Sequence, residues 1–280
     1  MENNQPEKKL AKSLAYIKKY CQLSPTIAII LGSGLGDFAD KLQNKVKIPT
    51  NRIPHYPHST VPGHKGFLVF GNIGKVPVMA VQGRTHYYEG YDIRDVAYVV
   101  RIMAKLDVKL LIVTNAAGGV NRNFKPGDLM IIRDHINFMF RNPLKGAVGK
   151  GETRWPDMGD AYDTEFSKII EQTGIDLKIP LWQGTLFVST GPTYETAAEV
   201  RMARSFGADA VSMSTVPEVL VARANNIRVV GISCITNYAT GIGNKALSHH
   251  EVTEIANLVK DKFRKLIEEV IIRTGKELIK

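Results

Sequence analysis

Polar and flexible residues follow each of six strand-like apolar runs in this chain. The six segments are IAIILGSGLG, VPVMAVQGRTH, LLIVTNAAGG, GTLFVSTGPTYE, ADAVSMSTVPE and RVVGISCITN. In an open α/β sheet, ligands bind beyond the carboxyl ends of the strands, where the backbone presents unpaired amides and loop side chains. The repetition therefore predicts one site assembled from many strand ends. Turn chemistry alone would not require Arg84 together with His86.

Three of these segments contain groups suited to an anion. In GRTHYYEGY, residues 83–91, Arg84 and His86 lie two apart in an extended stretch, so both side chains can point the same way. A guanidinium can bind phosphate through two parallel hydrogen bonds. Ser33 lies in a glycine-rich turn whose amides could hold a phosphate, and Ser214 precedes an expected helix start that favours an oxyanion. Taken singly, each motif is explained at least as well by a tight turn or a salt-bridged surface loop.

Two other segments offer groups for a heterocycle. Tyr194 and Glu195 place a flat ring beside a carboxylate, which suits a ring that carries N–H donors. Thr236 and Asn237 end a buried strand, and the Asn237 amide can both donate and accept hydrogen bonds. The small residues of TNAAGG allow a ligand to approach the backbone closely. A helix-start charge for Glu195 and a packed turn for TNAAGG are equally good alternatives.

Several other chemistries fit the sequence poorly. In LGSGLGD the glycine spacing is GxGxG, and Asp37 stands where the third glycine of a dinucleotide-binding fingerprint belongs, which argues against a nicotinamide-dependent oxidoreductase. Three prolines interrupt the helix that zinc spacing would need around His55, His58 and His64, so we expect no metal site. The GxSxG elbow of serine hydrolases is missing as well.

Composition excludes further classes of protein. The 280 residues are 44% hydrophobic and 23% charged, and no apolar stretch approaches the ~18 to 20 residues that span a bilayer. Cys21 and Cys234 lie far apart, which favours reduced thiols and a cytoplasmic location. The net charge of +10 comes without an aromatic-interleaved basic patch. We therefore expect no membrane and no nucleic-acid partner, and an anionic small substrate instead.

The elements that must position these groups alternate between strands and helices. Strands are expected near 27–31, 67–71, 76–82, 109–114, 128–133, 184–189, 208–212 and 228–234. This alternation is typical of an α/β fold with a largely parallel sheet. Neither an internal repeat nor a linker divides the chain. The loops 57–66 and 141–160 are expected to act as a lid or a subunit contact.

Helix boundaries are predicted from capping patterns. One helix is expected to open at Asp92, and a second one, in ETAAEVRMARSFG, to be closed by Gly207. Two pairs have the spacing of a capping box, namely Thr215 with Glu218 and Ser248 with Glu251. Both boxes would place a candidate ligand group, Ser214 or His249, at the positive end of a helix dipole.

The order of motifs GSGLG, VPGHKG, QGRTHYYEGY, TNAAGG, GPTYET, MSTVPE, ITN and LSHHEV resembles the trimeric, low-molecular-mass purine nucleoside phosphorylases over residues 20–275. The resemblance implies a single α/β domain, residues 1–280, with a mixed, partly barrel-like sheet flanked by helices. It implies a homotrimer with active sites near subunit contacts. The implied reaction is phosphorolysis of 6-oxopurine ribonucleosides and deoxyribonucleosides (inosine, guanosine), giving free base and (deoxy)ribose 1-phosphate in purine salvage. No cofactor is implied, and inorganic phosphate is a co-substrate.

Carried over position by position, the resemblance assigns a role to each motif. Phosphate would be bound by Ser33, His64, Arg84, His86, the Ala116 backbone amide and Ser214. The ribose would contact Tyr88, Met213 and His249, the last of these at the 5′-hydroxyl. The purine would be framed by Tyr194, Glu195, Thr236 and Asn237. His86, Glu195 and Asn237 would be the catalytic residues, with Asn237 donating to N7 and Glu195 accepting from N1–H.

Two related activities remain as alternatives, a methylthioadenosine phosphorylase-like enzyme and a xanthosine-preferring one. Methylthioadenosine phosphorylases favour a carboxylate where Asn237 stands and an apolar contact where His249 stands, and both positions argue against that alternative. A non-catalytic purine-binding protein would have no need for the phosphate-binding residues. One departure from the family concerns Gly151, which lies near the place of a Phe that covers the ribose of a neighbouring subunit; Trp155 or Phe140 could substitute for it.

Overall fold

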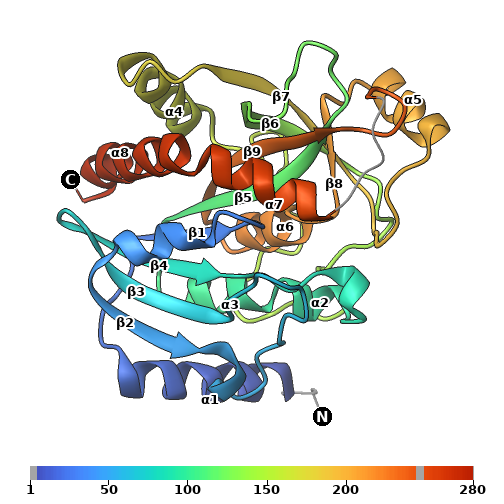
Figure 1. Ribbon diagram of the computed structural model, residues 1–280. Helices are drawn as coiled ribbons and strands as arrows, with labels where there is room; N and C mark the ends of the chain where they lie inside the picture. The colour runs from blue at the N-terminus through green and yellow to red at the C-terminus, as the bar shows by residue number, and fades with distance from the viewer. Residues whose placement is uncertain (1–4, 244–248, 280) are drawn as a thin grey trace.

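Nine strands of the described residues form one continuous sheet in the computed structural model, which describes residues 5–243 and 249–279 (Figure 1). The strands are β1 (Ile27–Leu31), β2 (Gln43–Pro49), β3 (Phe67–Ile73), β4 (Val76–Gln82), β5 (Leu110–Gly119), β6 (Leu129–Asn137), β7 (Leu181–Val188), β8 (Ala210–Ser212) and β9 (Arg228–Tyr238). The helices are α1 (Gln5–Tyr20), α2 (Ile93–Val96), α3 (Tyr98–Lys105), α4 (Thr164–Asp176), α5 (Ala197–Ser205), α6 (Val216–Ala224), α7 (His249–Leu258) and α8 (Lys260–Leu278).

Half of this sheet is closed into a barrel. The strand order is β2-β3-β4-β1-β5-β8-β7-β6-β9, and β9 pairs again with β5, so the five strands β5, β8, β7, β6 and β9 form a ring. Strand β1 is parallel to β4 and β5, whereas β3 is antiparallel to β4 and β6 is antiparallel to β9. The sheet is therefore mixed rather than largely parallel. The single α/β domain with a mixed, partly barrel-like sheet that the resemblance implied is confirmed.

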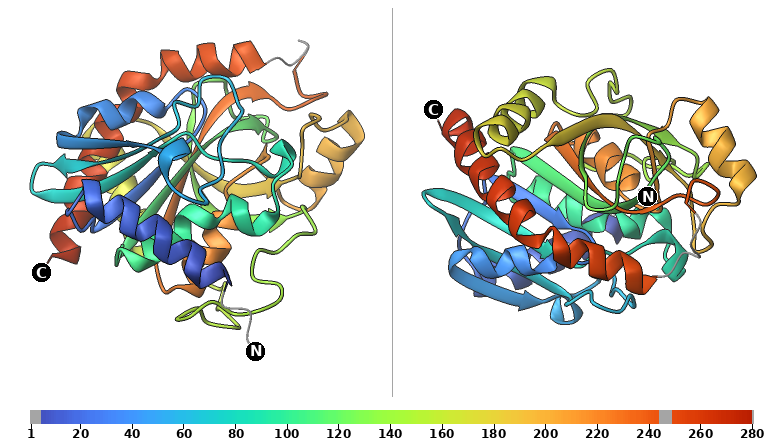
Figure 2. Two further views of the ribbon diagram at one scale, coloured as in Figure 1. Left: turned by 90° about the horizontal axis from the view of Figure 1, so that it is seen from below. Right: turned by 45° about the horizontal axis from the view of Figure 1, so that its top comes forward.

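Helices cover both faces of the open half of the sheet. Alternate residues of β1 point to opposite sides, as the period of a strand requires. Ile27 and Ile29 pack in one cluster with Phe263 of α8, whereas Ala28 and Ile30 belong to a second cluster with α1, α3 and α6. Figure 1 shows α1 and α8 on opposite sides of β1 to β4, and Figure 2 shows α7 and α8 crossing the molecule as one diagonal. Burial on both faces explains why β1 is apolar at every position.

The eight predicted strands are found, but several of them run further than predicted and a ninth strand was not predicted. Strand β5 runs to Gly119, so TNAAGG is part of the strand and not the turn that follows it. Strand β9 likewise continues through ITN to Tyr238. Strand β2 was not predicted, because most of QNKVKIP is exposed at the edge of the sheet and contains charged residues in place of an apolar run. The described helices contain none that is long and apolar enough to cross a membrane.

Helix α5 begins and ends as its sequence indicates. Thr196 and Glu199 form a reciprocal capping box, and Gly207 closes the helix at φ +89°. Asp92 caps α2 by accepting from the Arg94 N–H, although Ala97 separates α2 from α3 where one helix was expected. The box predicted at Ser248 lies outside the described residues.

Candidate active site

All six strand ends meet in one pocket of about 740 Å³, a volume that includes space open to solvent. Its wall is formed by residues from β1, β4, β5, β7, β8 and β9, with Val252 of α7 added: Gly32, Ser33, Arg84, His86, Tyr88, Asn115, Ala116, Ala117, Gly118, Tyr194, Glu195, Val211, Ser212, Met213, Ser214, Thr236, Asn237, Ala239 and Val252. The strand ends that were predicted to form one site therefore line one pocket.

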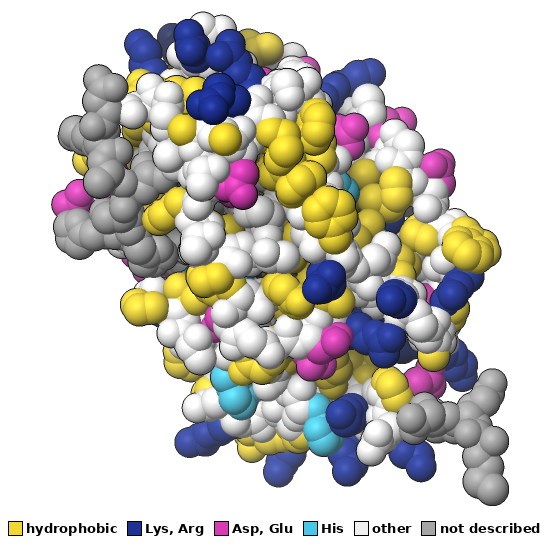
Figure 3. Space-filling model, turned by 90° about the vertical axis from the view of Figure 1, so that its right-hand side faces the viewer, with side chains coloured by type: hydrophobic (Ala, Val, Ile, Leu, Met, Phe, Trp, Pro, Cys, Tyr) yellow, Lys and Arg dark blue, Asp and Glu magenta, His cyan; other side chains and the backbone are white. Residues whose placement is uncertain are grey.

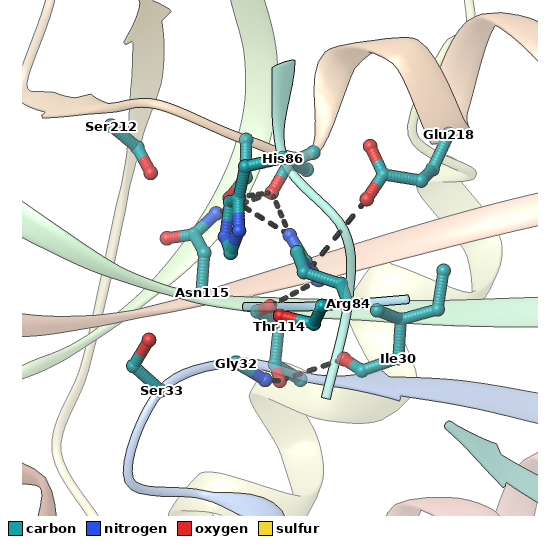
Figure 4. Close-up of polar contacts among 12 residues, drawn as sticks. Ile30, Gly32, Ser33, Arg84, His86, Thr114, Asn115, Ser212 and Glu218 are labelled. Atoms are coloured by element: carbon teal, nitrogen blue, oxygen red, sulfur yellow. Dashed lines mark hydrogen bonds and ion pairs between the residues drawn. The ribbon is translucent and has the colours of Figure 1, made fainter. Parts of the chain in front are cut away.

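Arg84 lines this pocket, and its guanidinium is buried among the polar groups drawn in Figure 4. Nη1 donates to Ser214 Oγ at 2.8 Å and to Thr215 Oγ1 at 3.0 Å, and Nη2 donates to the Thr114 carbonyl oxygen at 2.6 Å. A guanidinium has five N–H donors in a fixed fork. The three neighbours therefore fix the plane of the group while one Nη2 proton is left for another acceptor.

Glu218 is the buried counter-charge of Arg84. Glu218 Oε1 lies 3.6 Å from Arg84 Nε, and the two side chains are 1% and 3% exposed. The predicted capping box between Thr215 and Glu218 is therefore wrong. Thr215 makes no side-chain cap, has φ +88° and uses its hydroxyl oxygen to accept from Arg84 and Asn115. Neutralising a buried guanidinium outweighs capping a helix, because an unpaired buried charge costs several kcal/mol and a cap contributes only about 1 kcal/mol.

Thr114 connects the turn after β1 to the arginine. Its hydroxyl donates to the Ile30 carbonyl at 2.9 Å and accepts from the Gly32 N–H at 3.0 Å, while its own carbonyl accepts from Arg84. A Cβ on Gly32 would lie only 2.7 Å from the Asn115 Cα, so only glycine fits at this position. The Ser33 turn and the Arg84 side chain are thus held in one fixed geometry.

His86 is held by Glu89. The carboxylate accepts from His86 Nδ1 at 3.0 Å, from the His86 backbone N–H at 2.7 Å, and from both the N–H and the hydroxyl of Thr60 in the loop 57–66. Burial raises the pKa of Glu89, but these hydrogen bonds outweigh burial and lower it to about 2. Burial lowers the pKa of His86, with Glu89 opposing that shift. The result is a neutral imidazole whose Nδ1–H points at the carboxylate.

His64 lies behind the pocket wall and contacts the same cluster. Its Nδ1 donates to the Arg84 carbonyl oxygen at 2.8 Å, its Nε2 lies 3.4 Å from Ser33 Oγ, and its ring stacks on His86 at 5.3 Å. Burial lowers the pKa of His64 to about 4, and the neighbouring His86 adds to this shift. The neutral ring leaves Nε2 as an acceptor for the Ser33 hydroxyl.

Tyr88 and Met213 form a continuous wall beside this polar cluster. The Tyr88 ring stacks on His86 with ring centres 4.7 Å apart and an interplanar angle of 12°. A Cβ on Gly191 would lie 2.5 Å from Met213 Sδ and 3.1 Å from Tyr88 Cδ1, and Gly191 has φ +64°. Gly191 therefore allows the loop after β7 to approach both side chains closely.

Glu195 and Tyr194 reach the pocket from that same loop. Glu195 Oε1 accepts from Ser189 Oγ at 2.8 Å. Burial raises the pKa of Glu195, against hydrogen bonds from its own backbone N–H and from Ser189. Burial also raises the pKa of Tyr194, and the charges of Glu195 and Glu251 add to that shift.

The Asn237 amide has a fixed orientation at the end of β9. Asn237 Oδ1 accepts from the Thr236 hydroxyl at 2.9 Å, and Nδ2 donates to the Tyr238 carbonyl at 3.1 Å. Each atom keeps one further hydrogen-bonding site. The amide can therefore present one donor and one acceptor to a ligand.

The predicted site residues come together with two exceptions. His64 touches the pocket residues without lining the pocket, and His249 begins α7, but its side chain is not among those described. No role in the site was predicted for Glu218, Glu89, Thr114, Asn115 and Ser189, although each of them lies inside a motif quoted from the sequence. Within residues 5–243 and 249–279, no group of three or more His, Cys, Asp or Glu side chains is placed to hold a metal ion.

Comparison with known proteins gives one consistent result. The model of the phosphorylase superfamily matches residues 26–272. Purine nucleoside phosphorylase 1 of Bacillus subtilis is 51% identical over 267 residues, which cover 94% of this chain and 97% of that protein. The crystal structure of Schistosoma mansoni purine nucleoside phosphorylase in complex with inosine superimposes with a TM-score of 0.89 at 36% identity, covering 94% of this chain and 95% of the other. The same enzyme in complex with adenosine gives a TM-score of 0.89 at 37% identity, covering 94% of this chain and 96% of the other.

Proposed function

The chain belongs to the phosphorylase superfamily and, within it, to the purine nucleoside phosphorylases, and from this premise we propose how its pocket performs the reaction. The protein is an enzyme that cleaves the N-glycosidic bond of 6-oxopurine nucleosides such as inosine and guanosine with inorganic phosphate. The products are the free base and ribose 1-phosphate, or its deoxy form. The single observation that carries this function is that an arginine-centred polar cluster and a carboxylate-amide pair face the same pocket.

Phosphate binds at the cluster around Arg84. The remaining Nη2 proton, the Ser214 hydroxyl and the backbone amide of Ala116 supply donors on one wall of the pocket. The Ser33 hydroxyl joins them when it turns its one proton from His64 Nε2 to the phosphate. With Nδ1–H of the neutral His86 directed at Glu89, Nε2 is left to accept the P–OH of HPO₄²⁻. Held in this way, one phosphate oxygen is positioned to attack C1′ without a nucleophilic side chain.

The base binds at the opposite wall. Glu195 accepts the N1–H of a 6-oxopurine, and Asn237 Nδ2 donates to N7, while Tyr194 covers the ring. The Tyr238 carbonyl supports this role, because it can only accept and therefore fixes Nδ2 as the donor end of the Asn237 amide. Tyr88 and Met213 hold the ribose between the two walls. The family resemblance assigns the 5′-hydroxyl to His249.

The reaction breaks the C1′–N9 bond and forms a C1′–O bond to phosphate. The bonding electrons pass into the purine ring, and the sugar passes through an oxocarbenium-like state between two anions. Asn237 stabilises the charge that develops at N7, as an oxyanion hole stabilises an oxyanion. One such donor typically contributes about 3 to 4 kcal/mol to lowering the barrier.

Steady-state kinetics test this function. We expect hypoxanthine release from inosine to depend on phosphate with saturation, and guanosine to react comparably. Adenosine should be far slower, because its N1 is an acceptor that meets the Glu195 carboxylate. Hypoxanthine release at the same rate in phosphate-free buffer would instead indicate a hydrolase.

We also infer a homotrimer and a cytoplasmic location. The trimer is supported by the family resemblance and by hydrophobic side chains on the face that holds α2 and α5 (Figure 3), and Phe140 and Trp155 are 73% and 83% exposed. Either aromatic could stand where relatives use a Phe, since Gly151 has no side chain. The buried free thiols of Cys21 and Cys234 support a reducing compartment. Light scattering should give three times the 31.0 kDa chain mass; a monomer mass would contradict the trimer.

A further inference from the structure

Ser189 contacts the base-binding carboxylate from outside the pocket. It follows the last residue of β7, and its backbone N–H donates to the Ser212 carbonyl at 3.0 Å, which fixes its position between β7 and β8. Its hydroxyl donates to Glu195 Oε1 at 2.8 Å. Glu195 lines the pocket and Ser189 does not. Ser189 can therefore influence a ligand only through Glu195.

The surroundings of Glu195 give this hydrogen bond its importance. Burial favours the neutral acid, and the negative charge of Glu199 on α5 acts in the same direction. The Ser189 hydroxyl and the Glu195 backbone N–H oppose both effects. The other ionisable groups on the described walls of the pocket are Arg84, His86, Tyr88 and Tyr194. Of these, Arg84 and His86 already have carboxylate partners of their own, in Glu218 and Glu89.

The ionisation state of this carboxyl decides which purine fits. A 6-oxopurine presents N1–H and requires an acceptor, whereas a 6-aminopurine presents a bare N1 and requires a donor. A carboxylate accepts only, and a carboxylic acid can donate. A site built for one pattern rejects the other strongly, because a mismatch leaves buried polar groups unpaired.

We propose that Ser189 is a positioning residue that keeps Glu195 ionised and holds its Oε1, leaving Oε2 to the purine N1–H and thereby enforcing the preference for 6-oxopurines. This inference rests on the proposed function, since it needs Glu195 to contact the base. It adds a specificity determinant that touches neither base, sugar nor phosphate.

The test compares Ser189→Ala with Ser189→Thr, which restores the hydroxyl. Ser205→Ala is the matched control, because Ser205 is exposed on α5 and donates only to the Met202 carbonyl. For each protein, kcat/KM is measured for inosine and adenosine across pH 4.5 to 8. Calorimetric binding of hypoxanthine over the same pH range gives a readout independent of turnover.

In Ser189→Ala we expect kcat/KM for inosine at neutral pH to fall about ten-fold, the size of one hydrogen bond to a charged group. The loss should lie mainly in the KM for inosine, with the KM for phosphate unchanged. Removing the hydroxyl raises the pKa of Glu195 further. The fall of kcat/KM for inosine at acid pH, and the fall of hypoxanthine affinity at acid pH, should therefore both begin at a higher pH. As the pH is lowered, the ratio of kcat/KM for adenosine to kcat/KM for inosine should begin to rise at a higher pH than in the wild type. Ser189→Thr and Ser205→Ala should behave like the wild type.

Two results would overturn the inference. The first is that Ser189→Ala has the same acid limb in its pH profile and the same adenosine-to-inosine ratio of kcat/KM as the wild type. The second is that Ser189→Thr loses as much kcat/KM for inosine as Ser189→Ala does. Failure of the proposed function is separate, because the wild-type enzyme would then not release hypoxanthine in a phosphate-dependent way, whatever Ser189 does.

Discussion

The substitution Glu218→Gln tests the electrostatic basis of the phosphate site. It retains the shape of the side chain and one oxygen acceptor near Arg84 Nε, but removes the only buried carboxylate that the described residues place against this guanidinium. Burial lowers the pKa of Arg84 and Glu218 opposes that shift. The variant therefore leaves a cation in the interior without its counter-charge.

The magnitude follows from the burial of the pair. Breaking a buried ion pair by removing one partner costs about 3 to 5 kcal/mol. Gln retains the acceptor, and Thr114, Ser214 and Thr215 still hold the guanidinium, so we expect the free energy of unfolding to fall by about 2 to 3 kcal/mol. Phosphate at 100 times its Kd stabilises the wild type by about 2.7 kcal/mol. At the same phosphate concentration the variant should be stabilised by more than the wild type, because the anion replaces the missing counter-charge and therefore binds the variant more tightly.

Urea unfolding followed by circular dichroism, at one protein concentration and with or without phosphate, measures both quantities. Glu165→Gln is the matched control, since that carboxylate also pairs with an arginine, Arg228, but its side chain is 81% exposed. The control should match the wild type. Our reasoning is refuted if Glu218→Gln is as stable as the control, or if phosphate stabilises the variant no more than the wild type.

Three further perturbations have defined outcomes. Arg84→Lys keeps the positive charge but loses the planar set of N–H donors that binds phosphate through two parallel hydrogen bonds, so the KM for phosphate should rise about ten-fold or more. An unchanged KM for phosphate would remove Arg84 from the phosphate site. Asn237→Asp removes the donor to N7, so kcat/KM for inosine should fall about 100-fold and the adenosine-to-inosine ratio should rise; an unchanged ratio would contradict the assignment. The pKa of His64 is lowered to about 4, below its unfolded value of about 6.5, so the folded state loses up to about 2 kcal/mol as pH falls from 6.5 to 4. His64→Asn should lose that part of the pH dependence of unfolding, and an identical slope in both proteins would show that His64 does not cause it.

The strand ends could be predicted from the sequence because the evidence for them is local. An apolar run that stops at Gly, Ser, Asn or Arg identifies both the buried strand and the group that follows it, and Ser33, Arg84, Tyr194 and Asn237 were all found in this way. That these ends share a pocket follows from the general geometry of α/β sheets. The assignment of phosphate, sugar and base to particular residues required the resemblance between whole motifs.

The features that local sequence patterns do not specify depend on contacts between distant segments. Pairing of β9 with β5 closes the barrel, and no local pattern in either strand specifies that partner. Glu218 has the spacing of a helix cap, and only the position of Arg84, more than a hundred residues earlier, changes its role. Ser189 was hidden for the same reason, since its hydroxyl gains a function only through the turn that brings Glu195 back to it.

Phosphate is the nucleophile of the proposed reaction. Incubating the wild-type enzyme with inosine and ³²P-labelled phosphate, and then separating the products, measures where the label goes. We predict one labelled ribose 1-phosphate for every hypoxanthine released, with no free ribose. Hypoxanthine accompanied by free ribose, with all the label left in inorganic phosphate, would contradict the central claim.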